Sequence, residues 1–387
     1  MTTSMISSKT ASIRTSAAAP NSFFSSSYGI ARARFLHAAA QAGAVVHQYV
    51  HPTVRAPDGG TLSCDVAVLG PKDAKKAFVA VAGTHGPEGY AGSAAHLMLL
   101  QSGMARRLAP DCRIVLIHAI NPYGFAYGSR TTENNVDLNR NFIDHGKPHP
   151  YNALYPSLHS IVCSDKYSKA LHGAQVRAML AWTKEFGINA RNQALIAGQY
   201  SHPSGRTYGG RNREWSNLVL ERIAVEHLHG VERIAFIDWH TGLGKYGEEF
   251  FLCFNEPGSE TYEQCVKWWG ADRIQSSGGF EGAERPRYQG LLFSGLSDFV
   301  RPAKFAGAVV EFGILSNDEQ DAVFMLEYWL RFGDHSGVSV SAMKKVRKEL
   351  AEAFTPSAPE WRSSVSKRSS KILQEALSGL SGWQAAG

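Results

Sequence analysis

The sequence predicts an α/β fold, a single α/β/α sandwich domain built on a mixed, mostly parallel twisted sheet. Short apolar runs bounded by turn residues alternate with longer amphipathic segments, as in strand–helix–strand crossovers that place strands in parallel. Histidine or acidic residues also stand at or just after the ends of three apolar runs. Ligands bind at the carboxyl edge of an open α/β sheet, where such residues would gather.

The expected elements follow from periodicity and from the residues that begin and end them. An amphipathic helix is expected first, ending at Gly43. Ser316 and Glu319 form a capping box, which predicts that another helix begins there. The expected strands are 63–69, 77–83, 113–119, 233–239, 248–254 and 306–312. The expected helices are 28–43, 92–101, 166–186, 212–229, 259–269, 317–332, 338–354 and 361–380.

Two loop regions, 121–150 and 199–211, are rich in Gly, Pro and polar residues, and long loops inside a domain usually serve function. Because the candidate site draws on residues far apart in the chain, one large domain over 23–355 is expected. Residues 1–22, rich in Ser, Thr and Ala, are expected to be a disordered extension. Residues 356–387, which follow a proline-marked break, are expected to form a C-terminal helical appendage.

Composition excludes several classes of protein. The net charge is +6, but residues 1–57 carry +5 and residues 343–387 carry +4, which leaves −3 for the middle of the chain. A nucleic-acid partner is therefore not expected, because no basic stripe or recognition motif accompanies the charge. No membrane partner is expected either, because no apolar run is long enough to span a bilayer.

The five cysteines show no CxxC pair or disulfide framework, which favours a reducing compartment. The expected location is cytoplasmic, with a mitochondrial alternative because the N-terminus is basic and free of acids. The sequence does not determine the oligomeric state.

The candidate site combines His85 and Glu88 with two distant residues, His240 and Glu311. Two imidazoles and one carboxylate are a typical ligand set for a catalytic zinc, and a further carboxylate can act as general base. Each residue alone has an alternative: a solvated pair in a loop for His85 and Glu88, and a hydrogen-bonded core histidine for His240. Glu311 stands in an apolar strand, where an acid is costly unless it is paired or functional.

The loop over 121–150 adds polar groups to this set. Arg130 is a candidate for stabilising an oxyanion, and Asn139 with Arg140 can grip a carboxylate. Arg206, in the second glycine-rich loop, is a further candidate for recognising an acid, with surface solubility as its alternative.

Together these motifs resemble the zinc carboxypeptidase (M14) family, and especially its short DUF2817 branch, which is close to succinylglutamate desuccinylase and aspartoacylase. The resemblance covers roughly residues 25–335. It is carried by Gly83-Thr-His85-Gly-Pro-Glu88-Gly89, by Asp137-Leu-Asn139-Arg140 and by Val310-Glu311-Phe-Gly313. The combination is specific, whereas each motif alone is not.

The resemblance implies a role for each matching position. His85, Glu88 and His240 would bind one zinc ion per chain, and Glu311 would be the catalytic glutamate. Arg130 would polarise the scissile carbonyl. Asn139 and Arg140 would bind the substrate carboxylate. Asp137 would form a hydrogen bond with the first zinc-binding histidine without binding the zinc itself. Tyr288 matches the mobile active-site tyrosine, with packing under a loop as the alternative.

The implied activity is zinc-dependent hydrolysis of an amide bond next to a carboxylate. The substrate would be a peptide or small molecule with a free carboxylate, and two readings stay open: a carboxypeptidase acting on peptides, or a deacylase resembling aspartoacylase or succinylglutamate desuccinylase. Arg130 lies only nine residues before Asn139, as in the deacylase branch. A third reading, of another class, is a catalytically inactive binding module on the same fold.

Overall fold

The computed structural model describes residues 20–275 and 283–384, and its centre is one mixed sheet of eight strands. The expected extension 1–22 lies outside the described residues except for its last three. The strands stand in the order β1-β2-β4-β3-β5-β8-β6-β7. Their bounds are β1 Val45–Arg55, β2 Thr61–Leu69, β3 Lys76–Ala82, β4 Cys112–His118, β5 Arg233–Tyr246, β6 Glu249–Cys253, β7 Ile274–Gln275 and β8 Lys304–Gly313.

The middle of the sheet is parallel. β4, β3, β5 and β8 pair in parallel, whereas β1, β2 and β6 join by antiparallel pairing. Strands β3 and β4 have no exposed residue, as expected for parallel strands covered on both faces. The expected fold class, an α/β/α sandwich on a mixed and mostly parallel sheet, is therefore confirmed.

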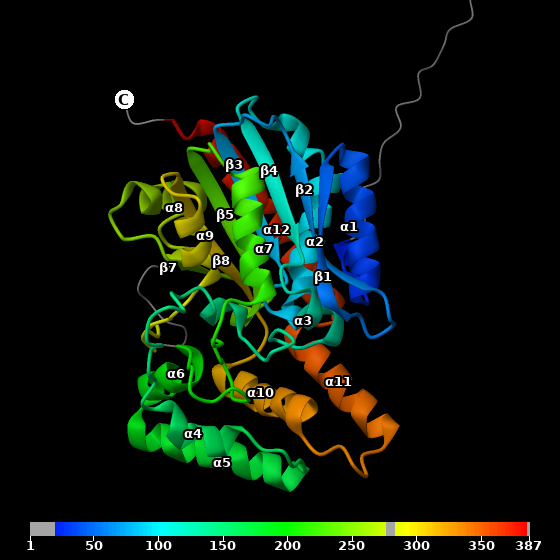
Figure 1. Ribbon diagram of the computed structural model, residues 1–387, viewed down its shortest axis with the longest axis vertical. Coiled ribbons are helices and arrows are strands. Elements are labelled where there is room, and N and C mark those ends of the chain that lie inside the picture. The colour runs from blue at the N-terminus through cyan, green and yellow to red at the C-terminus, as the bar shows by residue number, and fades with distance from the viewer. Residues whose placement is uncertain (1–19, 276–282, 385–387) are drawn as a thin grey trace, which may run out of the picture.

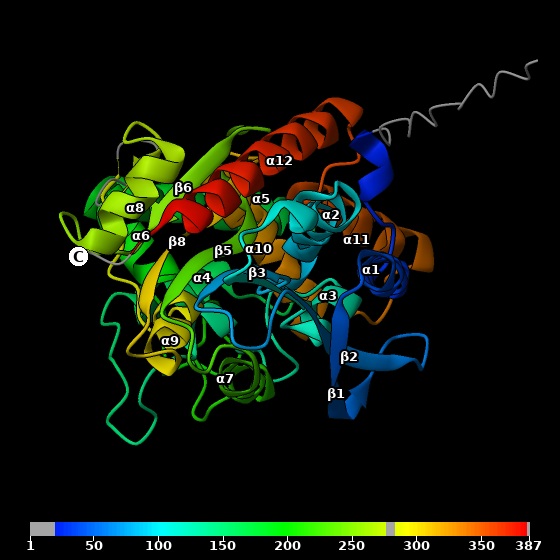
Figure 2. The same ribbon diagram turned by 90° about the horizontal axis from the view of Figure 1, so that it is seen from above.

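Helices cover both faces of this sheet (Figures 1 and 2). One face packs against α1, α2, α8 and α12, and the other against α7 and α9. The helices are α1 Tyr28–Ala42, α2 Gly89–Gln101, α3 Pro122–Tyr127, α4 Tyr155–Val162, α5 Lys169–Phe186, α6 Ile188–Ile196, α7 Trp215–His227, α8 Glu260–Trp269, α9 Leu292–Phe299, α10 Asn317–Phe332, α11 Val340–Phe354 and α12 Pro359–Gly382. Short 3₁₀ turns are η1 Pro20–Phe23, η2 Gly86–Glu88, η3 Met104–Arg107 and η4 Leu138–Arg140.

The C-terminal helix α12 belongs to the main core, whereas the sequence analysis sets residues 356–387 apart as an appendage. Trp361 is fully buried, and Ile372 and Leu380 also lie in the cluster formed by α2, β3 and β5. The physical reason is the amphipathic pattern of α12: its apolar stripe covers the sheet face beside α2 (Figure 2).

A third group of helices lies beyond the carboxyl ends of the parallel strands (Figure 1). It consists of α4, α5 and α6, which pack with α10 around Tyr155 and Trp182, and of α11, which packs against α10. These helices cover the edge of the sheet at which the parallel strands have their carboxyl ends. In the part of the chain that the structure describes, no helix is long and apolar enough to cross a membrane.

Candidate active site

The catalytic candidates meet where β3 ends and its parallel neighbours continue. The last residue of β3, Ala82, pairs with Trp239, so His240 is the first residue of β5 beyond the end of β3. His240 in turn pairs with Glu311 of β8. Both strands continue past the site, to Tyr246 and Gly313, so His240 does not end its strand as expected. It nevertheless lies at the carboxyl edge of the sheet.

A tight turn after β3 brings His85 and Glu88 to the same point. Gly83 has a φ of 76°, which glycine adopts without steric cost. Gly86 approaches the main chain of Gly124 so closely that a Cβ would lie 1.9 Å from its carbonyl carbon. Glu88 then ends η2 and precedes the first residue of α2; its side chain does not cap the helix, but this position favours negative charge.

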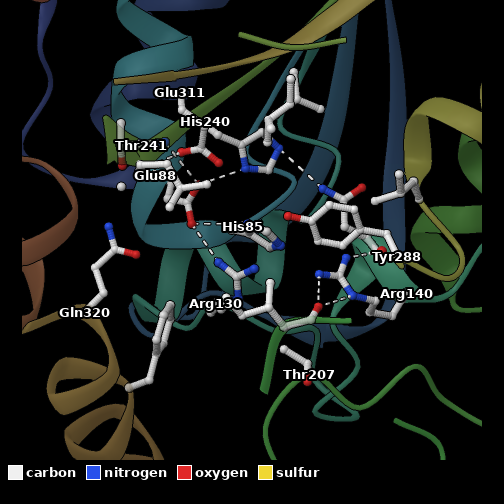
Figure 3. Close-up of a pocket in the computed structure, with 18 of the residues that line it drawn as sticks. His85, Glu88, Arg130, Arg140, Thr207, His240, Thr241, Tyr288, Glu311 and Gln320 are labelled. Carbon is white, nitrogen blue, oxygen red and sulfur yellow. Dashed lines mark hydrogen bonds and ion pairs between the residues drawn. The ribbon is translucent and has the colours of Figure 1, made fainter. Parts of the chain in front are cut away.

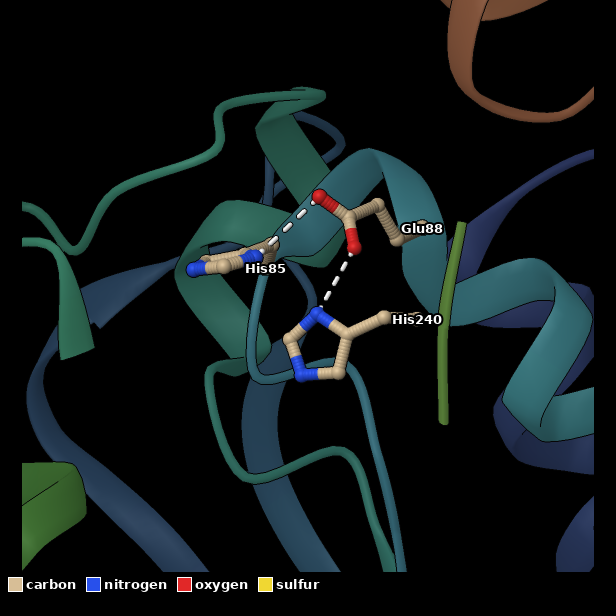
Figure 4. A group of neighbouring side chains, drawn as sticks. All are labelled: His85, Glu88 and His240. Carbon is tan, nitrogen blue, oxygen red and sulfur yellow. Dashed lines mark hydrogen bonds and ion pairs between the residues drawn. The ribbon is translucent and has the colours of Figure 1, made fainter. Parts of the chain in front are cut away.

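His85, Glu88 and His240 form a buried cluster (Figure 4). One carboxylate oxygen of Glu88 lies 3.1 Å from Nδ1 of His85, and the other lies 2.9 Å from Nδ1 of His240. One ligand atom from each residue lies within 4.8 Å of the others. The three side chains are at most 5% exposed. The structure therefore brings together the three residues that the sequence analysis assigns to a metal.

The outer nitrogen of each histidine faces a different carboxylate. Nε2 of His85 lies 3.0 Å from Oδ1 of Asp137, and Nε2 of His240 lies 2.9 Å from Oδ2 of Asp238. Thr84 donates a hydrogen bond of 2.8 Å to the other oxygen of Asp238. A carboxylate at Nε2 favours the tautomer that keeps Nδ1 available as a ligand atom.

The donor set fits a divalent cation. Nδ1 of His85 is buried and forms no hydrogen bond with a described residue, although Oε1 of Glu88 lies 3.1 Å away. Such a buried orphan nitrogen is costly unless a ligand satisfies it. Two imidazole nitrogens and a carboxylate are the ligand set of a catalytic zinc that keeps a position open.

Electrostatics favour a cation at the same point. Burial would raise the pKa of Glu88, but the charge of His85 and a hydrogen bond from His240 hold that pKa well below its usual range. Burial would likewise lower the pKa of His240, but Asp238 and Glu88 raise it above its usual value. Carboxylates thus surround His240 and stabilise positive charge there.

Glu311 lies beside the cluster without being one of its ligands. Its carboxylate accepts a hydrogen bond of 3.4 Å from the main-chain N–H of Leu243. Burial raises the pKa of Glu311 to about 7; the charge of His240 opposes this rise and that of Glu88 adds to it. A carboxylate with a pKa near neutrality is well matched to accepting and returning a proton.

Arg130 reaches the cluster from the loop after α3. Its guanidinium lies 3.0 Å from Oε1 of Glu88 and 3.3 Å from Oδ2 of Asp137. Its main-chain N–H donates to the carboxylate of Glu327 on α10. The arginine is thus held at both ends, with its charge beside the candidate metal ligands (Figure 3).

Asn139 and Arg140 line the same cavity but are already partly engaged. Asn139 accepts a hydrogen bond of 2.9 Å from the N–H of Leu292, and its amide nitrogen lies 3.5 Å from Nε2 of His240. Arg140 donates to the main-chain carbonyls of Asn139 and Ile196 through three nitrogens. Because a guanidinium carries five N–H groups, two remain for a ligand.

Tyr288 and Arg206 lie at different parts of the cavity wall. Arg140 lies over the ring of Tyr288, 5.0 Å from its centroid, and that ring also packs edge-on against Phe254. Arg206 directs its charge to Asp321 of α10, so the structure places it in the wall with a protein partner rather than free.

Two residues of the site are missing from the sequence analysis. Asp238 stands two residues before His240, and the period of a strand places both on one face, so the pattern contained a signal for it. Glu327 is 197 residues from Arg130 in the chain, and no local motif connects them. Only the packing of α10 against the loop after α3 reveals that contact.

The chain belongs to the family described as "protein of unknown function (DUF2817)", which matches residues 24–368. No curated protein sequence matches it. The family match extends beyond the resemblance expected from the motifs, through α11 and into α12. Membership agrees with the branch that the motifs indicated and leaves the activity to be argued from the site.

Several solved structures share a limited likeness with the chain. A metallo-carboxypeptidase from Pseudomonas aeruginosa is 14% identical, with a TM-score of 0.43, over 90% of this chain and 68% of that one. One from Burkholderia cenocepacia is 13% identical, with a TM-score of 0.42, over 90% and 68%. A succinylglutamate desuccinylase from a Silicibacter species is 13% identical, with a TM-score of 0.36, over 74% and 67%. Likeness at this level does not assign an activity.

Proposed function

We propose that the chain is a zinc-dependent hydrolase that cleaves an amide bond next to a carboxylate. One observation carries the proposal: two buried histidine nitrogens and one carboxylate converge on a single point, with a second, separate carboxylate beside it. His85, Glu88 and His240 would hold one Zn²⁺ per chain. When bound, the ion would acidify a water molecule and polarise the amide carbonyl.

The side chains around that point can carry the proton and charge changes of hydrolysis. Glu311 accepts a proton from water as the amide carbonyl is attacked, and returns it to the leaving amine. The guanidinium of Arg130 lies beside Glu88, one of the candidate metal ligands. Its positive charge there stabilises the negative charge that develops on the carbonyl oxygen. Asp137 and Asp238 keep the two imidazoles oriented throughout.

The remaining polar groups support a substrate with a free carboxylate. The two N–H groups of Arg140 not bound to main-chain carbonyls can form a bidentate pair with a carboxylate. Tyr288 packs against the same guanidinium and covers it from one side. The same cavity is lined by the candidate metal ligands, by Glu311 and by Arg130, so these groups can reach one bound ligand.

Metal content and turnover test this function together. We expect about one zinc per wild-type chain by elemental analysis, and loss of the metal in His85→Ala. Glu311→Gln should keep the metal and lose at least about 1000-fold in turnover of N-acyl amino acids, because an essential proton acceptor is gone. His145→Ala, in a histidine pair with His149, is a matched control that should keep both properties.

Two outcomes would contradict the proposal. A wild-type chain that takes up no stoichiometric zinc when zinc is offered would favour the inactive binding module. Equal turnover by wild type and Glu311→Gln would remove the assigned proton acceptor and with it the mechanism.

A further inference from the structure

A second cavity lies beside the active-site cavity, and the two share a wall. Arg130, Arg206, Thr207 and Phe324 line both cavities. The second one, of about 370 Å³ including its opening, continues along α10 toward Phe332. A substrate chain leaving the active site in this direction would have to pass the shared wall.

Phe324 is the apolar part of this wall, and two guanidinium groups hold its ring. The guanidinium carbon of Arg206 lies 4.1 Å from the ring centroid, and that of Arg130 lies 5.2 Å from it. Cations placed over an aromatic face are attracted to it, so both contacts fix the ring between the two cavities.

Ion pairs between three segments make the wall rigid. Arg206, from the loop 199–211, pairs with Asp321 on α10, about one turn before Phe324. Arg191 of α6, with a side chain only 1% exposed, pairs with Asp318 at 2.6 Å and approaches Asp321 at 3.5 Å. Opening the wall would separate Asp321 from Arg206 and Arg191, whose side chains are all largely buried, and this separation is strongly unfavourable.

The shared wall lies on the side of the active site that faces α10. In Figure 3, Arg140 and Tyr288 lie on one side of His85, and Gln320 of α10 lies on the other. Under the proposed function, Arg140 binds the carboxylate and Arg130 the acyl oxygen. The acyl group therefore points toward α10 and meets Phe324, which contacts Arg130 directly.

We propose that Phe324 closes the acyl side of the site and limits the substrate to amino acids with a short N-acyl group, which excludes peptides. This inference rests on the proposed function and names the substrate class of the same site. An acyl chain that extends past the ring must displace Phe324 together with the two arginines that hold it. Each surplus methylene in a closed pocket lowers kcat/KM by about 10-fold or more.

A series of acyl groups on one amino acid tests the limit. Leucine suits the series, because Leu252, Phe254 and Leu291 line the cavity. With the zinc-loaded wild type, we expect kcat/KM to fall at least about 100-fold from N-acetyl-leucine to N-hexanoyl-leucine. The tripeptide Ala-Ala-Leu should be a still poorer substrate.

Substitutions on α10 test whether Phe324 sets the limit on the length of the acyl chain. Phe324→Ala joins the two cavities. The ratio of kcat/KM for N-acetyl-leucine to kcat/KM for N-hexanoyl-leucine should therefore fall to within about 3-fold of unity. Phe324→Leu, which conserves more of the side-chain volume, should give an intermediate ratio and serves if the alanine variant does not fold. Phe332→Ala is the matched control, because Phe332 is on the same helix but lines only the second cavity. It should keep the wild-type ratio.

A binding measurement separates this inference from the proposed function. Calorimetry with Glu311→Gln, which should not turn over its ligand, gives Kd for the same compounds, and we expect the same order as in kcat/KM. If no compound is hydrolysed by wild type, the proposed function is wrong, and the Kd series still decides the size limit. Binding of N-hexanoyl-leucine or Ala-Ala-Leu as tight as that of N-acetyl-leucine, or no binding at all, would overturn the limit.

Discussion

The two histidines of the candidate metal site are oriented by carboxylates of different origin. Asp137 comes from the loop after α3 and also binds Arg130, whereas Asp238 comes from the same strand as His240. Asp238 is fully buried, and its second oxygen accepts a hydrogen bond from the hydroxyl of Thr84, the residue before His85. Asp238 therefore connects the strand that carries one ligand to the turn that carries the other.

We expect Asp238→Asn to weaken zinc binding about 10- to 100-fold, because an amide holds the imidazole of His240 less firmly in its ligand tautomer. Competition with a chromophoric chelator measures the affinity directly. Asp65→Asn is the matched control, since Asp65 is also a buried carboxylate but pairs with Arg32 away from the site. Equal zinc affinity in Asp238→Asn and wild type would contradict this role.

At the residue scale, the sequence sufficed where a residue of suitable chemistry stands at or just after the end of an apolar run. His85, Glu88, His240 and Glu311 could be assigned to one site because residues of these types stand at the ends of apolar runs. The engagement of Arg206 with Asp321 could not be predicted, because their contact depends on how the loop 199–211 packs on α10. Long-range ion pairs of this kind leave no local pattern.

At the scale of elements, the helices with a clear amphipathic pattern and good caps were predicted well. The capping box of α10 is present as expected, with both of its hydrogen bonds. The sequence analysis does not predict the edge strands β1 and β7 or the short helices α3, α4, α6 and α9. In β1, Pro52 and two histidines interrupt the alternation of apolar residues. α9 has only eight residues, which are too few for a helical pattern to be distinctive.

The integration of α12 into the core gives a prediction at this scale. Trp361 is fully buried, and its indole N–H donates to the carbonyl of Gly313, two residues after Glu311. We expect Trp361→Ala to lower the free energy of unfolding by about 3–5 kcal/mol, because it leaves a large cavity under β8. Urea unfolding followed by circular dichroism measures the loss.

Lys371→Ala provides the control on the same helix, because its side chain is 68% exposed and its pair with Glu375 is at the surface. It should change stability by less than about 0.5 kcal/mol. Similar stabilities of Trp361→Ala and Lys371→Ala would mean that α12 is an appendage after all.

For the whole molecule, the proposed metal binding would be coupled to folding. The three candidate ligands come from the turn after β3 and from β5, so an intact site requires the assembled sheet. We expect zinc at about 100 times its Kd to raise the free energy of unfolding by about 2.7 kcal/mol, and a chelator to remove this gain. Urea unfolding with and without zinc measures the effect. His85→Ala should show no zinc-dependent shift, and a shift as large as in wild type would place the stabilising ion elsewhere.

Stability against acid is a second property of the whole molecule, and two buried histidines outside the candidate metal site should contribute to it. His96 and His118 are fully buried between α2 and β4, beside Phe35. Burial holds the pKa of His96 well below its usual value, and burial lowers the pKa of His118 to about 3. Both rings are therefore neutral in the folded chain, whereas the unfolded chain protonates them below about pH 6.5.

Because the unfolded state binds the additional protons, stability should fall as the pH drops from about 6.5 toward about 3, by up to about 1.4 kcal/mol per pH unit for each histidine. His96→Leu removes one of the two contributions. At pH 5 it should therefore be more stable than wild type by about 2 kcal/mol. At pH 7.5 it should be equal or slightly more stable, because neither nitrogen of His96 has a hydrogen-bond partner among the described residues. Urea unfolding across this range tests the sign, with the exposed His37→Leu on α1 as control. Parallel stability curves for wild type and His96→Leu between pH 7.5 and 5 would show that His96 is not held neutral by the fold.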